Sequence, residues 1–404
     1  MSTSLLYHTM GIRGYRYLTT KYEKGEIIVT VAQDRETCRC PQCGSANIIL
    51  KGGEWRWFRG IPIGRKPVWI RFRVPRVQCR ECGTLRQVVI GFAEPRVTYI
   101  KAFQRYVLDL ADRMTIQDVA EHLGVSWDVV KEIVKANLKR NFAKPRLKDL
   151  RQIAIDEIAI GAGHRYLTLV LDLASGAVVH VGRGKGGDSL MDFWKRLRKS
   201  GAKIEAVGMD MSPAFIAAVK TNLPQAKIIF DRFHVMKLLN DKLSDLRRAM
   251  FRDIKDNLGR EVLKGSRWLL LKRPANLNPK HKEKERLEEA LRLNAPLATA
   301  YYLKEELYEF WELEDYYEAE TFLLQWIESA EATKIRQLVT FTQTLRAYHS
   351  GLLNYYDYPI SSGPLEGTNN KIKTMKRQAY GYRDQEFFQL KIYALHKARY
   401  ALVG

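Results

Sequence analysis

Carboxylates interrupt or end two apolar stretches of the chain, where an ionised side chain needs a partner. The run from 153 to 160 reads Ile-Ala-Ile-Asp-Glu-Ile-Ala-Ile, with Asp156 and Glu157 in its middle. A second apolar run ends at Asp210, two residues before Ser212 and a proline, which are typical of a helix start. Burial without a cation or hydrogen-bond donors raises the pKa of an aspartate. A metal site is therefore the first chemistry to test, and carboxylates that face water at strand ends are the alternative.

An aspartate and a histidine follow a third apolar run, at 226–230. Asp231 and His234 lie three residues apart at the expected junction of a strand and a helix. There they can share a ligand or contact each other. Equally, Asp231 can cap the helix that begins near His234, with the histidine merely paired to it. The residues alone leave both interpretations open.

A glutamate near the end of the chain begins a helix with a basic stripe. A proline and Glu366 stand in the expected first turn, where the helix dipole alone favours a carboxylate. Asn370, Lys373 and Arg377 follow at i+4, i+7 and i+11, on the same face of the helix. A carboxylate with an amide and two cations on one stripe indicates a metal ligand beside groups that hold phosphate.

All five cysteines lie within the first hundred residues, too few and too local for a secreted disulfide framework. Cys40 and Cys43 form one Cys-x-x-Cys-Gly knuckle, and Cys79 and Cys82 form a second. Four thiolates at this spacing predict one closed, tetrahedral structural Zn²⁺ site rather than four unrelated thiols. Cys38 is a fifth thiol that can take the place of Cys40.

The composition points to a polyanionic partner. The chain has 404 residues, 46% of them apolar, which is enough for two to four domains, and a formal charge of +22. Nucleic acid is favoured over a membrane because no segment approaches eighteen uncharged apolar residues. The N-terminus lacks a secretory signal pattern, so we expect a cytoplasmic protein.

The first 99 residues carry much of this charge, with 17 Lys and Arg against 7 Asp and Glu. Such a surplus suits phosphate contacts, although it also fits an ordinary solvated surface. Between the cysteine pairs, the run from Trp55 to Arg59 and the alternating residues 68–74 predict a hairpin. We expect arginines on one face of this hairpin and apolar residues on the other.

Residues 115–134 have the pattern of two helices joined at a glycine. A helix ends near Gly124, and a second begins after Ser126, which is a good helix cap. This pattern predicts a helix-turn-helix motif, with Ser126, Trp127 and Lys131 near the major groove. Any helical hairpin with a glycine turn looks similar. Residues 139–150 form a basic linker.

From residue 151 the pattern changes to strands alternating with helices. Three strands, then helix, strand, helix and strand, is the order of a ribonuclease-H-like fold. Residues 235–355 are helical in pattern almost throughout, as at 237–251 and 303–327, and we interpret them as an insertion. We expect Trp268, Trp311 and Trp326 in its core. The expected elements are strands at 153–160, 166–173, 177–182, 207–210 and 226–230, and helices at 188–199 and 212–222.

Taken together, these motifs resemble the ISL3 family of bacterial insertion-sequence transposases, within the DDE superfamily. The resemblance rests on Asp156-Glu157, on Met209-Asp-Met-Ser-Pro-Ala-Phe, on Asp231-Arg-Phe-His234, on Gly363-Pro-Leu-Glu366-Gly-Thr-Asn-Asn-Lys and on Tyr380-Gly-Tyr. The zinc knuckles and the helix-turn-helix stand where the family has them. The resemblance implies that Asp156, Asp210 and Glu366 are catalytic and together hold two Mg²⁺ or Mn²⁺ ions. It also implies that Asp231 and His234 support the site.

The implied fold is multidomain, with α+β and α/β parts. The resemblance further implies a nucleoid-associated enzyme that binds the terminal inverted repeats of an insertion sequence, cuts DNA and joins the end to target DNA, as a homodimer in the synaptic complex. Alternatives are a domesticated DNA-binding regulator without catalysis and a nuclease that only hydrolyses. The expected segments are a zinc-ribbon DNA-binding domain at 1–99, a helix-turn-helix domain with its linker at 100–150, a ribonuclease-H-like core at 151–234 and 356–404, and an all-helical insertion at 235–355.

Overall fold

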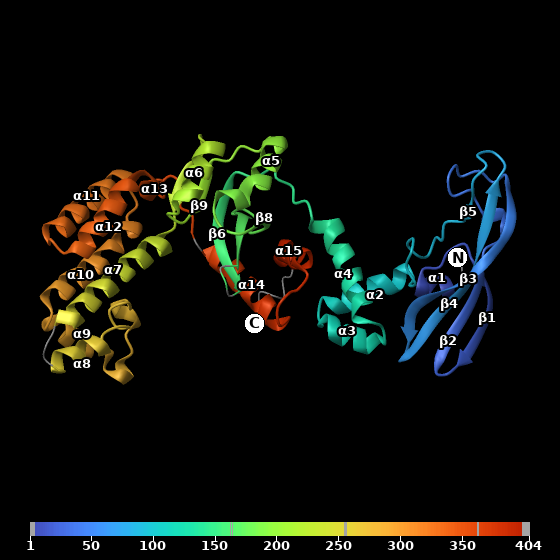
Figure 1. Ribbon diagram of the computed structural model, residues 1–404, viewed down its shortest axis with the longest axis horizontal. Helices are drawn as coiled ribbons and strands as arrows, with labels where there is room; N and C mark the ends of the chain where they lie inside the picture. Colours follow the sequence, from blue (N-terminus) through green and yellow to red (C-terminus); the bar gives the residue numbers. More distant parts are fainter. Residues whose placement is uncertain (1–4, 162, 164, 254–256, 362, 398–404) are drawn as a thin grey trace. The chain divides into compact units, whose positions relative to one another are not determined.

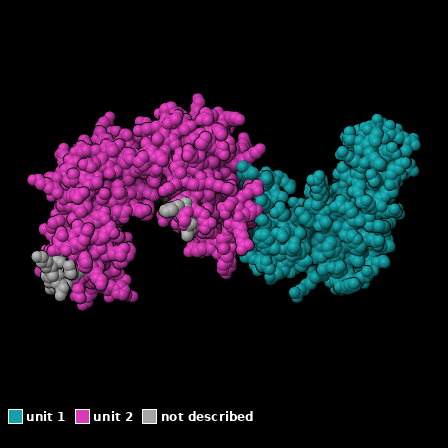
Figure 2. All heavy atoms as spheres, in the orientation of Figure 1, with its two compact units in different colours: residues 1–143 teal, residues 144–404 magenta. Residues whose placement is uncertain are grey.

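A computed structural model of the chain describes residues 5–161, 163, 165–253, 257–361 and 363–397 (Figure 1). The chain forms two compact units, unit 1 at Met1–Ala143 and unit 2 at Lys144–Gly404 (Figure 2). Each unit contains its own five-stranded sheet. The expected zinc ribbon and the helices of the expected helix-turn-helix therefore fall within unit 1, whereas the expected linker at 139–150 is divided, with 139–142 in the last helix of unit 1 and 144–150 in unit 2.

The sheet of unit 1 is built around a long hairpin of two strands, β3 and β4. Its order is β1-β2-β4-β3, with β5 also paired to β4, and β2 runs parallel to β4. Val68, Ile70, Phe72 and Val74 alternate along β4 and are buried. The elements before the helical segment are α1 Leu5–Met10, β1 Arg16–Glu23, β2 Glu26–Ala32, β3 Ile48–Ile63, β4 Lys66–Cys79 and β5 Leu85–Gln87.

The distribution of side chains over the two faces of the hairpin differs from the expectation in two respects. The register pairs Trp57 with Arg71 and Trp55 with Arg73, so the tryptophans share the arginine face and not the apolar one. The alternation of strand side chains fixes this placement, because residues two apart must face the same way. The buried residues of β4 share one face as expected, but Arg56 lies on that apolar face, opposite Phe72, and the expected arginine face carries indole rings as well.

Three helices complete unit 1 and confirm the expected helix-turn-helix. They are α2 Lys101–Ala111, α3 Ile116–Leu123 and α4 Trp127–Phe142. Thr115 and Asp118 form a capping box at the start of α3, and Gly124 ends that helix with φ +60°. Ser126 caps α4 by accepting a hydrogen bond from the amide of Val129 at 3.4 Å.

The sheet of unit 2 has the order β10-β9-β6-β7-β8. The strands β6, β7 and β8 form an antiparallel meander, whereas β9 and β10 run parallel to β6. A helix precedes each of the two parallel strands, as the crossover connections require. The strands and intervening helices are β6 Gln152–Gly161, β7 Arg165–Asp172, β8 Val178–Arg183, α5 Met191–Ser200, β9 Ala206–Met209, α6 Pro213–Asn222 and β10 Lys227–Phe230.

Both faces of this sheet are covered, which explains the uninterrupted apolar runs in its strands. Ile153 and Ile155 on β6 pack into a core that includes residues of α5 and α6. Ala154 and Ile158 face the opposite way, into a core shared with α14 Gly363–Gln378 and α15 Gln385–Tyr393. Figure 1 shows α14, from the C-terminal part of the chain, beside β6. A segment about 200 residues away therefore covers the face on which Asp156 lies.

Between β10 and α14 the described residues contain helices and no strand. Asn354 returns the chain to the sheet, because its amide donates to the carbonyl of Ile228 on β10 at 2.8 Å. None of the described helices is long and apolar enough to cross a bilayer. The helices are α7 Arg232–Asp253, α8 Asn257–Gly265, α9 Glu283–Arg292, α10 Ala295–Leu307, α11 Tyr316–Ala332, α12 Arg336–Ala347 and α13 His349–Leu353.

Two expectations for this helical region are wrong in detail. The segment 303–327 is not one helix, because α10 ends at Leu307, a short 3-10 turn spans Glu309–Glu312 and α11 begins at Tyr316. Asp315 caps α11 through the amides of Tyr317 and Glu318, and so sets a new helix start. Trp311 and Trp326 are buried as expected, whereas Trp268 is 63% exposed, with Arg267 over its ring at 4.6 Å.

Candidate functional site

Three aspartates of unit 2, which we call the acidic row, lie next to one another: Asp156 in the middle of β6, Asp210 directly after β9 and Asp231 directly after β10. The register pairs Ile155 of β6 with Met209 of β9, so Asp156 and Asp210 are the next residues on neighbouring strands. The amide of Asp231 donates to the carbonyl of Met209 at 3.0 Å, which puts Asp231 beside Asp210. Asp156, Asp210 and Asp231 thus lie where β9 and β10 end beside β6, at the carboxyl ends of the two parallel strands, where open α/β sheets bind ligands.

Asp156 is held from two sides. Its Oδ1 accepts from the amide of Glu157 at 2.7 Å, and its Oδ2 accepts from Nδ2 of Asn369 on α14 at 2.6 Å. Burial raises the pKa of Asp156, the two hydrogen bonds and the nearby His234 oppose that rise, and the charge of Asp210 adds to it. An acceptor-only carboxylate in such surroundings favours a bound cation.

Asn369 also presents an unsatisfied atom at this site. Its Oδ1 is buried and has no hydrogen-bond partner among the described residues. The other side of the amide must donate to Asp156, because an ionised carboxylate only accepts. The free amide oxygen can therefore serve as a hard oxygen ligand for Mg²⁺, or accept a hydrogen bond from a water bound to that ion.

Asp210 and Asp231 each receive the first amides of the following segment. Asp210 Oδ1 accepts from the amide of Ser212 at 3.1 Å, and Asp231 Oδ1 accepts from the amide of Phe233 at 2.9 Å. The second oxygen of Asp231 lies 3.7 Å from Nε2 of His234. Asp231 therefore both caps the start of α7 and pairs with His234, so its role as a cap does not exclude it from the acidic row.

Glu157 points away from Asp156, as strand alternation requires. Its Oε1 accepts from the amide of Gly186 at 3.2 Å. Burial raises the pKa of Glu157, with the Gly186 amide acting in the opposite direction. Only one of the two adjacent carboxylates therefore faces α14.

Glu366 lies near this row but is not gathered into it. It is exposed in the first turn of α14, three residues before Asn369, which is about 4.5 Å along a helix axis. Asn370, Lys373 and Arg377 are exposed on the same helix, as expected for their stripe. Among the described residues, only the four cysteines form a group of three or more metal-binding side chains whose ligand atoms lie within 4.8 Å of one another.

The cysteines of unit 1 converge on one point. Cys40 Sγ lies 3.6 Å from Cys82 Sγ, and Cys43 Sγ lies 3.5 Å from Cys79 Sγ. Tetrahedral zinc with Zn–S bonds of about 2.3 Å requires sulfurs roughly 3.8 Å apart, so the four fit that ion. The Thr84 hydroxyl and amide lower the pKa of Cys82 to about 6, whereas at Cys43 the Ser45 amide is outweighed by the neighbouring thiols and burial, which raise its pKa to about 12. Cys38 lies outside the group and is directed toward the carbonyl of Asp34 at 3.6 Å.

The start of α4 presents the residues expected at the major groove. Ser126 and Trp127 are exposed, the indole by 43%. Lys131 Nζ lies 5.4 Å from the centroid of the Trp127 ring. An exposed ring with a cation over it, at a helix N-terminus, can contact a phosphate backbone.

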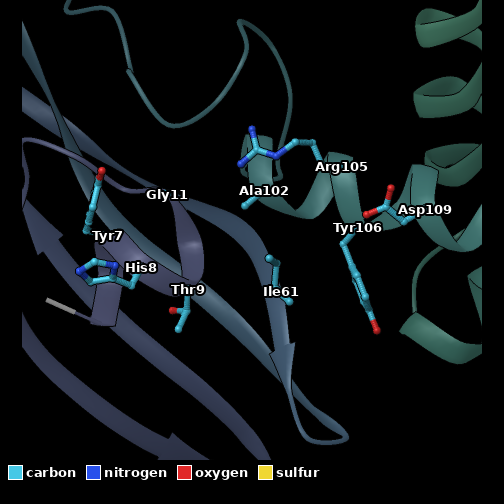
Figure 3. Close-up of a pocket in the computed structure, with 9 residues that line it drawn as sticks. All are labelled: Tyr7, His8, Thr9, Gly11, Ile61, Ala102, Arg105, Tyr106 and Asp109. Carbon is cyan, nitrogen blue, oxygen red and sulfur yellow. The ribbon is translucent and has the colours of Figure 1, made fainter. Parts of the chain in front are cut away.

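Unit 1 also contains a pocket of about 530 Å³, which does not have the features of a metal site. Figure 3 shows its lining from α1, β3 and α2, with Tyr7, His8, Arg105 and Asp109 among the side chains. Asp109 is its one carboxylate, so it lacks the set of acidic ligands that a hard cation requires. The acidic row of unit 2 remains the candidate for chemistry.

Sequence reasoning missed Asn369. The prediction counted i+4 from Glu366 and so selected Asn370. In the structure the preceding residue, Asn369, contacts Asp156. A step of three, which also keeps residues on one helix face, would have found it.

Comparison with known proteins defines the class of molecule. The family model described as "Transposase", of the ISL3 type, matches residues 153–392. The zinc-finger model of transposase IS204/IS1001/IS1096/IS1165 matches residues 36–82, and the helix-turn-helix model of transposase family ISL3 matches residues 90–136.

Individual relatives agree with this class. The chain is 33% identical over 369 residues to the transposase for insertion sequence element IS1001 of Bordetella parapertussis, covering 88% of each chain. It is 28% identical over 375 residues to the transposase for insertion sequence element IS1557 of Mycobacterium tuberculosis, covering 86% of this chain and 83% of that one. The chain therefore belongs to the ISL3 family of transposases, and it is a DNA transposase, an enzyme that cleaves and transfers DNA.

A likeness to a solved structure is much weaker. The Drosophila P element transposase strand transfer complex matches 67% of this chain and 82% of that chain at 12% identity, with a TM-score of 0.34. A score this low does not establish a common fold.

Proposed function

We propose that the chain binds the terminal inverted repeats of its insertion sequence and catalyses metal-dependent strand cleavage and strand transfer by in-line attack at phosphorus. The observation that carries the proposal is that Asp156, in the middle of β6, lies beside Asp210, which directly follows the end of β9, with Asn369 of α14 bonded to Asp156. Glu366, one turn earlier on that helix, is the third acidic residue.

The sheet order supports a ribonuclease-H-like core. An antiparallel meander followed by two parallel strands on its other side, with Asp156 on the first strand, is the arrangement that such a core requires. The helices between β10 and α14 then form an insertion that returns at Asn354.

The donor set fits a hard divalent cation. Asp156, Asp210 and Glu366 would hold two Mg²⁺ or Mn²⁺ ions, and oxygen ligands are those that such ions prefer. The ions would supply charge that activates a water or a DNA 3′-hydroxyl and stabilises the leaving oxygen. Asn369 orients Asp156, and Asp231 and His234 support the row from β10 and α7.

Unit 1 recognises the DNA at the ends of the element. Cys40, Cys43, Cys79 and Cys82 hold one structural Zn²⁺, which fixes the ribbon. Ser126, Trp127 and Lys131 contact the duplex at α4, while Asn370, Lys373 and Arg377 hold phosphates beside the acidic row. Because two ends are joined in one reaction, the synaptic complex contains two copies of the chain and also engages target DNA.

The test is a cleavage and strand-transfer assay with the full chain. A labelled duplex that carries the inverted repeat of the element is incubated with Mg²⁺ and plasmid target. Asp156→Asn, Asp210→Asn and Glu366→Gln should each abolish cleavage and joining and leave end binding nearly intact. Asp192→Asn, an exposed carboxylate on α5, is the matched control. Retained Mg²⁺-dependent cleavage in one of the three variants would remove that residue from the catalytic set.

A further inference from the structure

One face of the β3–β4 hairpin in unit 1 carries tryptophan and arginine side by side and stays open to solvent. Trp55 and Trp57 are 47% and 43% exposed. The Arg71 guanidinium lies between them, with its Cζ 4.2 Å from the Trp55 ring centroid and 5.6 Å from that of Trp57. Arg73 follows two residues further along β4 and is exposed on the same face. We call these four residues the Trp–Arg face.

The arginine at its centre has no acidic partner. Among the residues that the structure describes, no carboxylate pairs with Arg71, and its Nε is buried without a hydrogen bond. The two strands together contain one acidic residue, Glu54. It pairs in register with the buried Val74, on the other face, and accepts from the side chain of Gln87 at 3.1 Å. The Trp–Arg face is therefore a cationic surface that lacks an anion.

The indole rings of Trp55 and Trp57 are not part of the hydrophobic core of unit 1. The opposite face of β4 already supplies the buried apolar residues, with Phe72 in edge contact with Tyr15 and Phe92. Rings that stay exposed while the core is complete indicate a surface that contacts something else. Stacking on indole also holds a guanidinium in a fixed orientation, which reduces the entropy that it loses when it binds an anion.

A third arginine ties this face to the helix-turn-helix. Arg59 lies two residues beyond Trp57 on β3, and its Nη2 donates to the carbonyl of Leu123 at 2.6 Å. The backbone of Arg59 also bonds to Thr98 and Ile100, which precede α2. Leu123 is the last residue of α3, directly before the turn that leads to Trp127. The hairpin and the turn are thus bonded to each other within unit 1.

We propose that the Trp–Arg face is a second DNA-binding surface, which holds the sugar-phosphate backbone of the same duplex that α4 contacts. Arg71 and Arg73 bind phosphates through the planar fork of the guanidinium, and Trp55 and Trp57 pack on the adjacent sugars. The inference rests on the proposed function, because it presupposes a duplex at the helix-turn-helix. It adds a site in the zinc ribbon itself, in which the metal-stabilised sheet contacts DNA.

The test measures how DNA affinity depends on salt. Full-length, zinc-loaded protein is titrated into a fluorescent duplex that carries the inverted repeat, at several salt concentrations. Removing one cation that neutralises a phosphate lowers the log–log slope by about 0.9. Arg71→Ala/Arg73→Ala should therefore lower the slope by about 1.8 and the affinity at low salt by at least about tenfold.

The control removes two positive charges elsewhere in unit 1. Arg16 and Lys101 are already paired with Asp34 at 3.3 Å and Glu94 at 3.5 Å, so Arg16→Ala/Lys101→Ala should leave the slope unchanged. Zinc content and melting temperature check the fold of each variant. If the double variant misfolds, the single variant Arg73→Ala, at an exposed position, should still lower the slope by about 0.9.

Each outcome has a distinct meaning. A double variant with the wild-type slope refutes the Trp–Arg face and leaves the proposed function standing. A wild-type protein whose affinity barely changes with salt refutes duplex binding by unit 1 as a whole. A loss of affinity confined to a single-stranded probe of the same sequence overturns the assignment to duplex backbone and indicates unpaired nucleotides instead.

Discussion

Removal of the Asn369 amide tests how the acidic row is assembled. Nδ2 of Asn369 donates to Asp156 Oδ2 at 2.6 Å and connects α14 to β6. A hydrogen bond to a charged group contributes about 1.5–3 kcal/mol. If the bond holds Asp156 in its working position, Asn369→Ala should slow Mg²⁺-dependent cleavage roughly 10- to 100-fold. The assay is single-turnover cleavage of a labelled end at saturating protein.

The same change should alter the pH profile in a known direction. The Asn369 bond lowers the pKa of Asp156, whereas burial raises it. Without the amide the pKa of Asp156 rises further, and metal binding requires the ionised carboxylate. The acidic limb of the cleavage profile, measured from about pH 6 to 9, should therefore move to higher pH in Asn369→Ala.

Asn370 provides the matched control, because it is the same residue type at the next position and is exposed. Asn370→Ala should weaken DNA binding and leave the acidic limb where it is. A wild-type pH profile in Asn369→Ala, or an equal shift in both variants, would refute the positioning role of Asn369.

Two further predictions concern metal and stability. Chelation of zinc, or the substitution Cys79→Ser, should unfold the zinc ribbon, as measured by circular dichroism. The control Cys38→Ser should retain one zinc ion per chain. A ribbon that stays folded after chelation would contradict the zinc site. In metal-free protein, Asp156→Asn should raise the melting temperature of unit 2 at pH 7, by about 2–4 °C for a change on the order of 1 kcal/mol. Burial raises the pKa of Asp156, so the stability linked to its protonated form is present below the unfolded pKa and lost as pH rises through the folded pKa. An unchanged or lower melting temperature in the variant at pH 7 would contradict this reasoning.

The sequence predicts those elements that depend on local chemistry. The two cysteine knuckles converge as their spacing requires, and Ser126 caps α4 as its type requires. The strands β6 to β10 fall within one or two residues of the expected ranges, because a strand buried on both faces leaves an uninterrupted apolar run. The catalytic roles of Asp156, Asp210 and Glu366 stay predictions, although strand register puts the first two side by side.

The features that the sequence did not predict depend on contacts between distant segments. The amide that meets Asp156 is Asn369 and not Asn370, because the packing of α14 on β6 sets the rotation of that helix. Trp268 is exposed although its type favours burial, since the neighbouring Arg267 rather than the core covers its ring. In the hairpin, the alternation predicted the shared face of Arg71 and Arg73, whereas the register of β3 on β4 puts Trp55 and Trp57 beside them and Arg56 on the apolar face.

The three acidic residues differ in how firmly the fold holds them, and this difference bears on when the site forms. Asp156 and Asp210 are fixed by strand register and by backbone amides, whereas Glu366 is exposed on the first turn of α14. Three carboxylates brought together without a cation repel one another, so a rigid arrangement of all three would cost stability. In the proposed site two members lie on the sheet and the third on a helix joined to it through Asn369, so that cost would be avoided until divalent ions bind. Metal binding should therefore protect the backbone amides of α14 from hydrogen exchange more than those of β6, and equal protection of the two would argue for a preformed site.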